Sequence, residues 1–288
     1  MRERKGIREK NRRWNVGVLL MLPSLIGTCV FCVVPFLDVV RISFFKIISG
    51  EFAGIDNYVE VLHNPAFRLA TRHTLSFWGI GITLQIGGAF LIARALTGKE
   101  RKYGWIKSVG LLPMVVPVAC VAMFWEIFFD ANGILNALVH AAGGDTADWL
   151  NSKAAFGVLI ISYLWRNVGY DEVLWSARLA AIPREQYEAA KVDGAGKWMC
   201  FRYITAPNMK TTLFLIVVLS LLNSFKIFRE AYLVAGEYPH ESIYMIQHLY
   251  NNWYRGFAFD KIAAASVLHF LVILVLVLLL QKIWNREE

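Results

Sequence analysis

Apolar residues gather in six long runs that are separated by polar segments. A helix that crosses the hydrocarbon core of a bilayer needs about 20 consecutive, mostly apolar residues. Six windows meet this requirement, and they cover Val16–Val40, Thr74–Leu96, Ile106–Phe129, Ala154–Trp175, Thr211–Phe228 and Ile262–Ile283. The pattern predicts an all-α integral membrane protein with six transmembrane helices. Residues 1–15 form a basic segment before the first span, and we expect residues 16–288 to form one six-span domain.

The distribution of charge predicts how these spans are oriented. An even number of spans places both termini on one side, and that side carries twenty Lys and Arg residues, in segments 2–13, 94–107, 178–210 and 282–286. The other side carries eight. Because basic residues are retained in the cytoplasm, we expect both termini to be cytoplasmic. The formal net charge of +8 therefore reflects topology, and we expect no nucleic-acid partner.

Several motifs with enzymatic associations are incomplete in this chain. The sequence GAGKW at Gly194–Trp198 resembles the end of a phosphate-binding loop, but no Ser or Thr follows Lys197 and no strand is predicted before it. The six histidines show no spacing of i and i+4 with an acid that is typical of a zinc enzyme. We therefore expect no catalytic residues, no metal and no cofactor bound by this chain itself.

The segment between the fourth and fifth spans is the most polar stretch of the interior of the chain. Pro183 and Glu185 are typical of a helix start, and Gly194 is typical of a helix end, so a first helix of about ten residues is predicted. A second helix should run from Lys197 to Ile204 and end before Pro207, because the residue before a proline disfavours helix.

This segment resembles the EAA loop of ATP-binding-cassette importer permeases, and of sugar-type permeases in particular. The matching residues are EAA at Glu188–Ala190, DGA at Asp193–Ala195, Phe201, Ile204 and Pro207. The similarity extends to LLMLPSLIGTCVFCVVPFLDVVRISF at 19–44, GIDNYVEVL at 54–62, LLPMVVPVA at 111–119 and NSFKIFREAYLVAGEYP at 223–239. The chain departs from the family in having Ala206 before Pro207, where Leu is usual, and in lacking a further proline near Thr211.

The resemblance implies that the loop at 183–207 is a coupling helix that docks into a cytoplasmic ATPase subunit. The residues it assigns to this coupling are Glu185, Tyr187, Glu188, Ala189, Ala190, Asp193, Gly194 and Pro207. It also implies a bacterial cytoplasmic membrane location, a second permease subunit, two ATPase subunits that bind the ATP, and an extracytoplasmic solute-binding protein. The alternative is an amphipathic loop that lies on lipid headgroups, but such helices carry a wide apolar face that Glu185–Asp193 lacks.

Polar residues inside two spans mark a candidate substrate path. In the fourth span Tyr163, Asn167 and Tyr170 recur at i, i+4 and i+7, and in the fifth span we assign Ser220, Asn223 and Ser224 to the path. Aromatic rings, amides and hydroxyls suit a neutral sugar, although Asn and Ser also link helices in membranes. We expect Arg166, Asp171, Glu172 and Glu230 to be charges at a subunit interface or at a cavity gate.

Three other functions are compatible with parts of the pattern. The chain could import another solute, such as glycerol phosphate, by the same ATP-driven mechanism. A proton-coupled secondary transporter would need an intramembrane acid, for which Asp171 and Glu172 are candidates, but such folds usually show paired repeats. An intramembrane enzyme would need a nucleophile and a base, and no such constellation is present.

Overall fold

A computed structural model describes residues 18, 20–225, 231–232 and 239–285. The predicted basic segment 1–15, the end of the fifth predicted span and Glu230 lie outside the described residues. Contacts divide the chain into two units, residues 1–63 with 253–273 and residues 64–252 with 274–288. The described part of the chain is helical and contains no strand, apart from an isolated bridge between Phe45 and Phe52.

The first unit begins with one long helix, Leu20–Ile42, that accommodates a proline without breaking. A wide π-turn, η1 (Cys29–Val33), precedes α2 (Val34–Ile42), and the amide of Val34 donates to the carbonyl of Cys29. Pro35 then falls in the first turn of α2, where its missing N–H is tolerated. In the same unit the rings of Phe36 and Phe270 lie 4.8 Å apart, so α2 packs on the first half of α15 (Phe259–Asn285).

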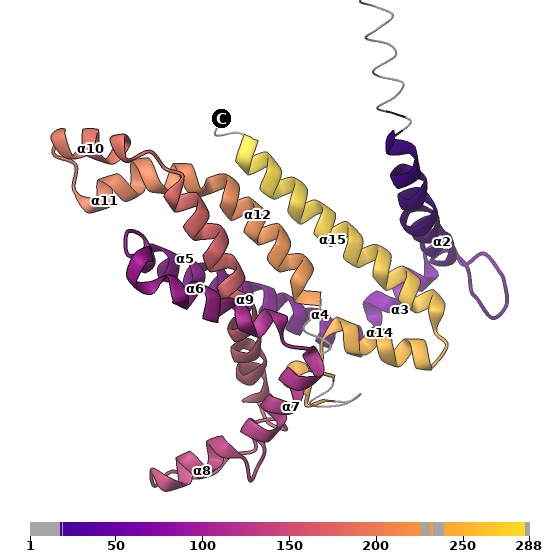
Figure 1. Cartoon of the computed structure of the whole chain (residues 1–288). Helices are drawn as coiled ribbons and strands as arrows, with labels where there is room; N and C mark the ends of the chain where they lie inside the picture. The colour runs from indigo at the N-terminus through magenta and orange to yellow at the C-terminus, as the bar shows by residue number, and fades with distance from the viewer. Residues whose placement is uncertain (1–17, 19, 226–230, 233–238, 286–288) are drawn as a thin grey trace, which may run out of the picture. The chain divides into compact units, whose positions relative to one another are not determined.

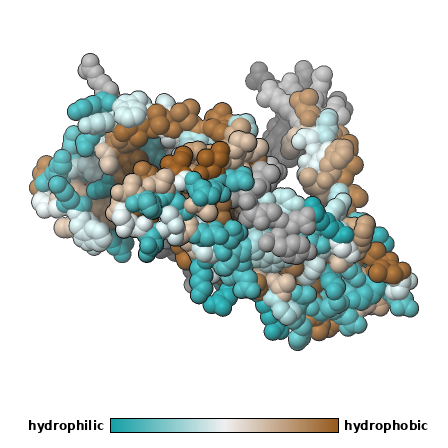
Figure 2. All heavy atoms as spheres, turned by 90° about the horizontal axis from the view of Figure 1, so that it is seen from below, coloured by the Kyte–Doolittle hydropathy of each residue, from teal (hydrophilic) through white to brown (hydrophobic). Residues whose placement is uncertain are grey.

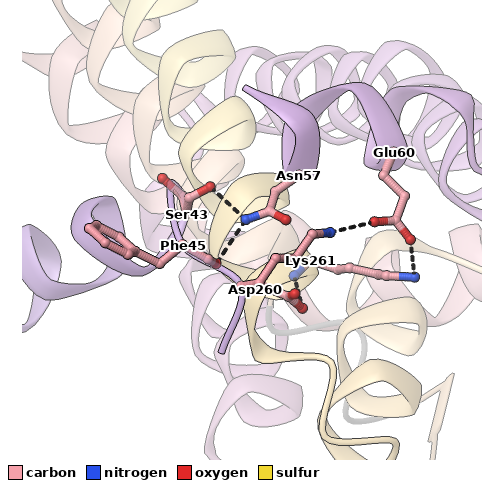
Figure 3. Close-up of polar contacts among 7 residues, drawn as sticks. Ser43, Phe45, Asn57, Glu60, Asp260 and Lys261 are labelled. Atoms are coloured by element: carbon pink, nitrogen blue, oxygen red, sulfur yellow. Dashed lines mark hydrogen bonds and ion pairs between the residues drawn. The ribbon is translucent and has the colours of Figure 1, made fainter. Parts of the chain in front are cut away.

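A polar cluster fixes the loop after α2 to its neighbours (Figure 3). On α3 (Asp56–His63), the buried amide of Asn57 donates to the carbonyls of Ser43 and Phe45, both at 3.0 Å. Glu60 forms ion pairs with Lys261 at 2.6 Å and with Lys46 at 2.9 Å. Hydrogen bonds from these two ammonium groups, Lys261 first, lower the pKa of the Glu60 carboxyl. The loop is therefore joined to both α3 and the first turn of α15.

The second predicted span lies inside a longer continuous helix in the second unit. This helix consists of α4 (Pro65–Phe77), the π-turn η2 (Trp78–Ile82) and α5 (Thr83–Leu96). It begins nine residues before the predicted Thr74 because Asn64 caps it: the Asn64 side chain accepts a hydrogen bond from the amide of Phe67 at 3.1 Å.

The prediction of an unbroken third span at 106–129 is wrong. The structure has two helices there, α6 (Glu100–Val115) and α7 (Val118–Phe129), and Val116 and Pro117 between them are extended. Pro117 has no N–H to continue the helix, and its ring disfavours helical geometry at Val116. After α7, the short helix α8 (Ile134–Ala141) lies in the following loop.

The long helix α9 (Ala155–Ala180) packs against α5, α6 and α12 (Ala206–Ser224) and is the centre of the second unit (Figure 1). The backbone of α9 meets that of α6 where Gly169 lies against Gly110. A Cβ added at Gly169 would overlap the carbonyl oxygen of Gly110. Small residues let the two backbones touch, as is common between membrane helices.

A buried cluster joins α5, α9 and α12 on the side of α9 near its C-terminal end. The indole N–H of Trp175 donates to the carbonyl of Ile86 at 3.3 Å, and the ring lies 5.3 Å from that of Phe90. The buried members of the cluster are Ala89, Ala93, Trp175, Leu179, Ile182, Met209 and Ile216. Small alanines on α5 leave room for the large indole, so the three helices pack as one block.

Five helices in the described chain are long and apolar enough to cross a membrane, which does not confirm the predicted count of six. They are Leu20–Ile42, Pro65–Leu96, Val118–Ala141, which takes α7 and α8 together, Lys197–Ser224 and Phe259–Lys282. The helix α9 has 26 residues, a length of about 39 Å, but it carries Arg166, Asp171, Glu172 and Arg178. Many large apolar side chains are exposed, among them Leu20 and Phe31, and apolar areas lie beside polar ones on the face seen in Figure 2.

Candidate functional site

The segment between α9 and α12 contains the predicted first helix, α10 (Arg184–Val192). Pro183, which was predicted to be the first helical residue, is the N-cap, so the helix begins one residue later at Arg184, and Glu185 lies in the first turn. The helix ends in a Schellman motif, in which the amide of Ala195 donates to the carbonyl of Ala190 at 2.8 Å and the amide of Gly194 to that of Lys191 at 3.0 Å. Gly194 has φ +79°, which favours glycine.

The prediction that the second helix ends before Pro207 is wrong. The helix α11 (Lys197–Cys200) continues through the π-turn η3 (Phe201–Thr205) directly into α12. In this turn the amide of Ala206 donates to the carbonyl of Phe201, five residues back. The shift of register places Pro207 in the first turn of α12, where its missing N–H costs little.

Polar contacts attach α10 to the start of α12. The hydroxyls of Tyr187 and Thr205 lie 2.9 Å apart, and Thr205 is buried. The side-chain Nε of Arg178 donates to the carbonyl of Asn208 at 2.6 Å, which joins the end of α9 to the same region. Tyr187 also packs against the buried cluster of α5, α9 and α12. The α10 helix is therefore attached to the helical core mainly through the aromatic side chain of Tyr187, with a further hydrogen bond of 3.4 Å from the Asn208 amide to the Gln186 side chain.

A second attachment runs from α11 and η3 to α5. The guanidinium of Arg94 lies 5.6 Å from the centre of the Phe201 ring, a cation–π arrangement. The ring centre of Phe90 on α5 lies 6.1 Å from that of Phe201, and the ring centre of Trp198 on α11 lies 5.5 Å from it. The two short helices of the loop are thus connected to the core at different points.

The opposite face of the loop is exposed and makes no such contact with the part of the chain that the structure describes. Glu185, Glu188 and Ala189 are exposed on α10, as are Asp193 and Gly194 at its end, while Ala190 is half-buried. Pro207 is exposed at the start of α12.

The structure adds exposed apolar residues that the sequence reasoning missed. Val192 is 88% exposed, Trp198 71% and Tyr203 74%, and Met199 is also exposed. Several large apolar side chains within one polar loop are the signal that would have indicated them, because exposed apolar patches often mark a contact with a partner.

The candidate path residues fall into two groups, and the first is buried. Tyr163 is 1% exposed, donates from its hydroxyl to the carbonyl of Ser220 at 3.4 Å, and meets the ring of Phe77 edge-on at 4.9 Å. Ser224 accepts a hydrogen bond from the indole N–H of Trp78 at 2.9 Å. The structure therefore brings Tyr163, Ser220 and Ser224 into contacts between helices.

The second group is half-buried and more accessible. Asn167 donates from its side chain to the carbonyl of Tyr163, four residues earlier on the same helix, at 2.9 Å. Tyr170 and Asn223 are half-buried as well. The sequence reasoning missed Trp78, whose contact with Ser224 joins residues that are 146 positions apart in the chain.

Two buried carboxyls follow on α9. Asp171 accepts a hydrogen bond from the side-chain amide of Gln85 on α5 at 2.7 Å. Glu172 accepts one from the Ser176 hydroxyl at 2.6 Å. Arg166 is half-buried. Among the described residues there is no group of three or more His, Cys, Asp and Glu side chains placed to hold a metal ion.

The chain is a multi-span α-helical membrane protein. This class is defined by its long apolar helices, by the glycine contact between two helices and by its exposed apolar side chains. Residues 85–287 match the family described as "Binding-protein-dependent transport system inner membrane component", and the chain belongs to that family.

Two curated relatives cover almost the whole chain. The probable ABC transporter permease protein YurN of Bacillus subtilis is 31% identical over 277 residues, which cover 92% of this chain and 93% of that protein. The trehalose/maltose transport system permease protein MalF of Thermococcus litoralis is 28% identical over 271 residues, which cover 92% of each.

Solved structures show the same fold. A chain of a bacterial ABC transporter involved in the import of the acidic polysaccharide alginate has a TM-score of 0.79 and 24% identity, covering 97% of this chain and 98% of that one. A chain of a bacterial alginate ABC transporter in complex with an alginate pentasaccharide-bound periplasmic protein has a TM-score of 0.75 and 23% identity, covering 97% and 96%.

Proposed function

We propose that this chain is a permease subunit of an ATP-driven sugar importer. In this proposal it pairs with a second permease chain and two cytoplasmic ATPase subunits, which bind the ATP, and it receives its sugar from an extracytoplasmic binding protein. The family of binding-protein-dependent inner membrane components supports the binding protein and the transport role. A carbohydrate substrate is supported by the relative that transports trehalose and maltose and by the similar structure of a transporter that imports alginate.

The observation that carries the proposal is the two-sided construction of α10. Its outer face exposes Glu185, Glu188 and the apolar Val192, and Trp198 on α11 is exposed as well, a mixture of charge and apolar area that suits docking onto another protein. Its inner face is attached through Tyr187 to the block formed by α5, α9 and α12. A displacement of the docked helix would therefore move packed helices rather than a loose loop.

The candidate path lies within the same block, which relates the docking surface to the solute. Tyr163 and Ser220 belong to α9 and α12, and both helices contribute to the cluster that holds Tyr187. We propose that movement of α9 against α12, driven by the ATPase, alters access to Asn167, Tyr170 and Asn223. Half-buried amides and a tyrosine ring suit the hydroxyls and C–H faces of a sugar.

Reversal of one charge tests the coupling role. Glu188→Lys should reduce both sugar uptake and recovery of the ATPase with a tagged permease by about tenfold or more, since it changes a docking surface and no buried contact. Asp145→Lys is the matched control, because Asp145 is also an exposed acid but lies in the loop after α8. Co-purification is followed by immunoblot and uptake with radiolabelled maltose and other sugars. Normal uptake and normal ATPase recovery in Glu188→Lys would refute the coupling assignment.

A further inference from the structure

The short helix α8 exposes a row of apolar side chains. Four apolar residues recur at i, i+3, i+4 and i+7 and so lie along one side of the helix. We call this row the α8 stripe, and it consists of Ile134, Ala137, Leu138 and Ala141. All four are exposed, Ile134 at 49% and Leu138 at 60%. In Figure 1 α8 lies beyond the end of α7, the helix on which it packs.

The opposite side of α8 is fixed to the molecule by a buried asparagine. Asn136 is 2% exposed, and its side-chain amide donates to the carbonyls of Ala131 at 2.9 Å and Ala147 at 2.8 Å. Its Oδ1 accepts a hydrogen bond from the indole N–H of Trp149 at 2.9 Å. A helix at the surface of a soluble domain is arranged the other way, with apolar residues inward and polar residues outward. The α8 stripe therefore needs a covering that the described chain does not supply.

The sequence around α8 favours a protein over the bilayer as this covering. Amphipathic helices that lie on a bilayer are rich in Lys and Arg on their polar face. The segment 130–152 contains neither residue. The helix α8 also does not continue α7 through a membrane, because the non-helical residues Asp130–Gly133 separate the two helices and Asp130 is exposed.

We propose that the α8 stripe docks into an apolar groove of the extracytoplasmic solute-binding protein. The proposal rests on the proposed function, since it takes its partner from the binding-protein-dependent family, and on the predicted orientation, which places segment 130–153 outside. It adds the surface of this chain that makes the contact and the chemistry of the complementary surface.

The geometry of α8 suits this kind of docking. Helices that bind in grooves use anchors at i, i+3, i+4 and i+7, which is the spacing of the α8 stripe. Ile134 and Leu138 are the large anchors, and the two alanines let the walls of a groove approach the helix closely. The hydrogen bonds of Asn136 hold α8 in place before the partner arrives, so little conformational freedom is lost on binding.

Photo-cross-linking in intact cells of the native host tests the contact directly. The photoreactive residue p-benzoylphenylalanine replaces Leu138 in one variant of the full-length chain and His140 in another. His140 is also exposed on α8, but two residues along a helix correspond to a rotation of about 200°. We expect a cross-linked product from position 138 that mass spectrometry identifies as a solute-binding protein, and little or none from position 140.

A charge placed in the α8 stripe tests its role in transport. Leu138→Glu should reduce sugar uptake by about tenfold or more, because docking would bury an unpaired carboxylate in an apolar groove. His140→Glu introduces the same side chain on the same helix and should leave uptake near the wild-type value. Leu138→Met keeps an apolar side chain of similar volume and should retain uptake. Melting temperature and recovery of the ATPase with the tagged permease should be unchanged in all three, which shows that the variants fold and assemble.

Position 192 separates a failure of this inference from a failure of the proposed function. Val192 on α10 is 88% exposed, and p-benzoylphenylalanine in its place should cross-link to the ATPase. Suppose that position 192 captures the ATPase while position 138 captures lipid, the second permease or nothing. This result would overturn the docking of α8 and leave the proposed function intact.

Two further results would overturn the docking of α8: equal yields of the binding protein from positions 138 and 140, or normal uptake in Leu138→Glu. The converse result, in which position 138 captures the binding protein and position 192 captures no ATPase, would support the docking of α8 and refute the coupling role of α10.

Discussion

Ser224 shows how a single residue can carry a role that its position in the sequence does not reveal. Its place in an apolar span beside Asn223 predicted a contact with solute, whereas its hydroxyl is used by Trp78, 146 residues away in the chain. Tyr163 likewise is buried against Phe77 and Ser220. Such contacts depend on how helices meet in space, so the sequence alone does not tell which of these polar residues are accessible.

Two substitutions separate these roles at the residue scale. Ser224→Ala should lower the melting temperature, because it leaves the buried Trp78 N–H without its acceptor at a cost of about 1–3 kcal/mol. Sugar uptake per assembled complex should change little. Tyr170→Ala removes a half-buried ring and should reduce uptake while the melting temperature stays near the wild-type value. Differential scanning fluorimetry and uptake in the same preparations check both, and the reverse pattern would remove Tyr170 from the path.

Three prolines explain which helices the sequence predicted well and which it did not. Pro117 breaks the predicted third span, while Pro35 and Pro207 lie in helices that continue, because a π-turn before each shifts the hydrogen-bond register. The rule that proline disfavours helix at the residue before it applies equally to all three prolines. What differs is whether a π-turn precedes the proline. In contrast, the start and end of α10 were predicted within one residue, since Glu185 and Gly194 act through neighbouring backbone groups.

At the scale of an element, the attachment of α3 to α15 should depend on pH through Glu60. Its pKa is lowered in the folded chain by Lys261 and Lys46. The stabilisation is therefore fully present above the ordinary carboxyl pKa of about 4.3 and is lost as the pH falls through the lowered value. Glu60 is partly exposed, so the effect should be modest and weakened by salt.

Melting temperatures between pH 3 and pH 6 measure this effect. The difference between the wild type and Glu60→Gln should be largest at pH 6 and should shrink toward pH 3. Glu51→Gln is the control, because Glu51 is an exposed acid in the same loop without an ion pair among the described contacts. A constant difference across the pH range would show that the carboxylate charge does not stabilise this attachment.

For the whole molecule, the charge distribution predicts an orientation that cysteine labelling can measure. In a variant with Cys29, Cys32, Cys120 and Cys200 replaced by serine, Ala147→Cys should react in intact cells with an impermeant maleimide, and Gln186→Cys should react only after lysis. Both positions are exposed, so access depends on the side of the membrane. Ala147 is also held by backbone hydrogen bonds to the buried Asn136, which keeps its loop in place. Labelling of position 186 alone in intact cells would reverse the orientation.

The charged residues of α9 have a consequence for how the protein is made. Each Asp, Lys or Arg near the middle of a lone helix adds about 2.5–3.5 kcal/mol to the cost of insertion into a bilayer. The carboxyl of Asp171 accepts a hydrogen bond from Gln85, which belongs to α5, a helix that is synthesised earlier. We therefore expect α9 to wait at the translocon until α5 is beside it and to leave into lipid as a pair. The order of synthesis, from N-terminus to C-terminus, then becomes part of the assembly pathway.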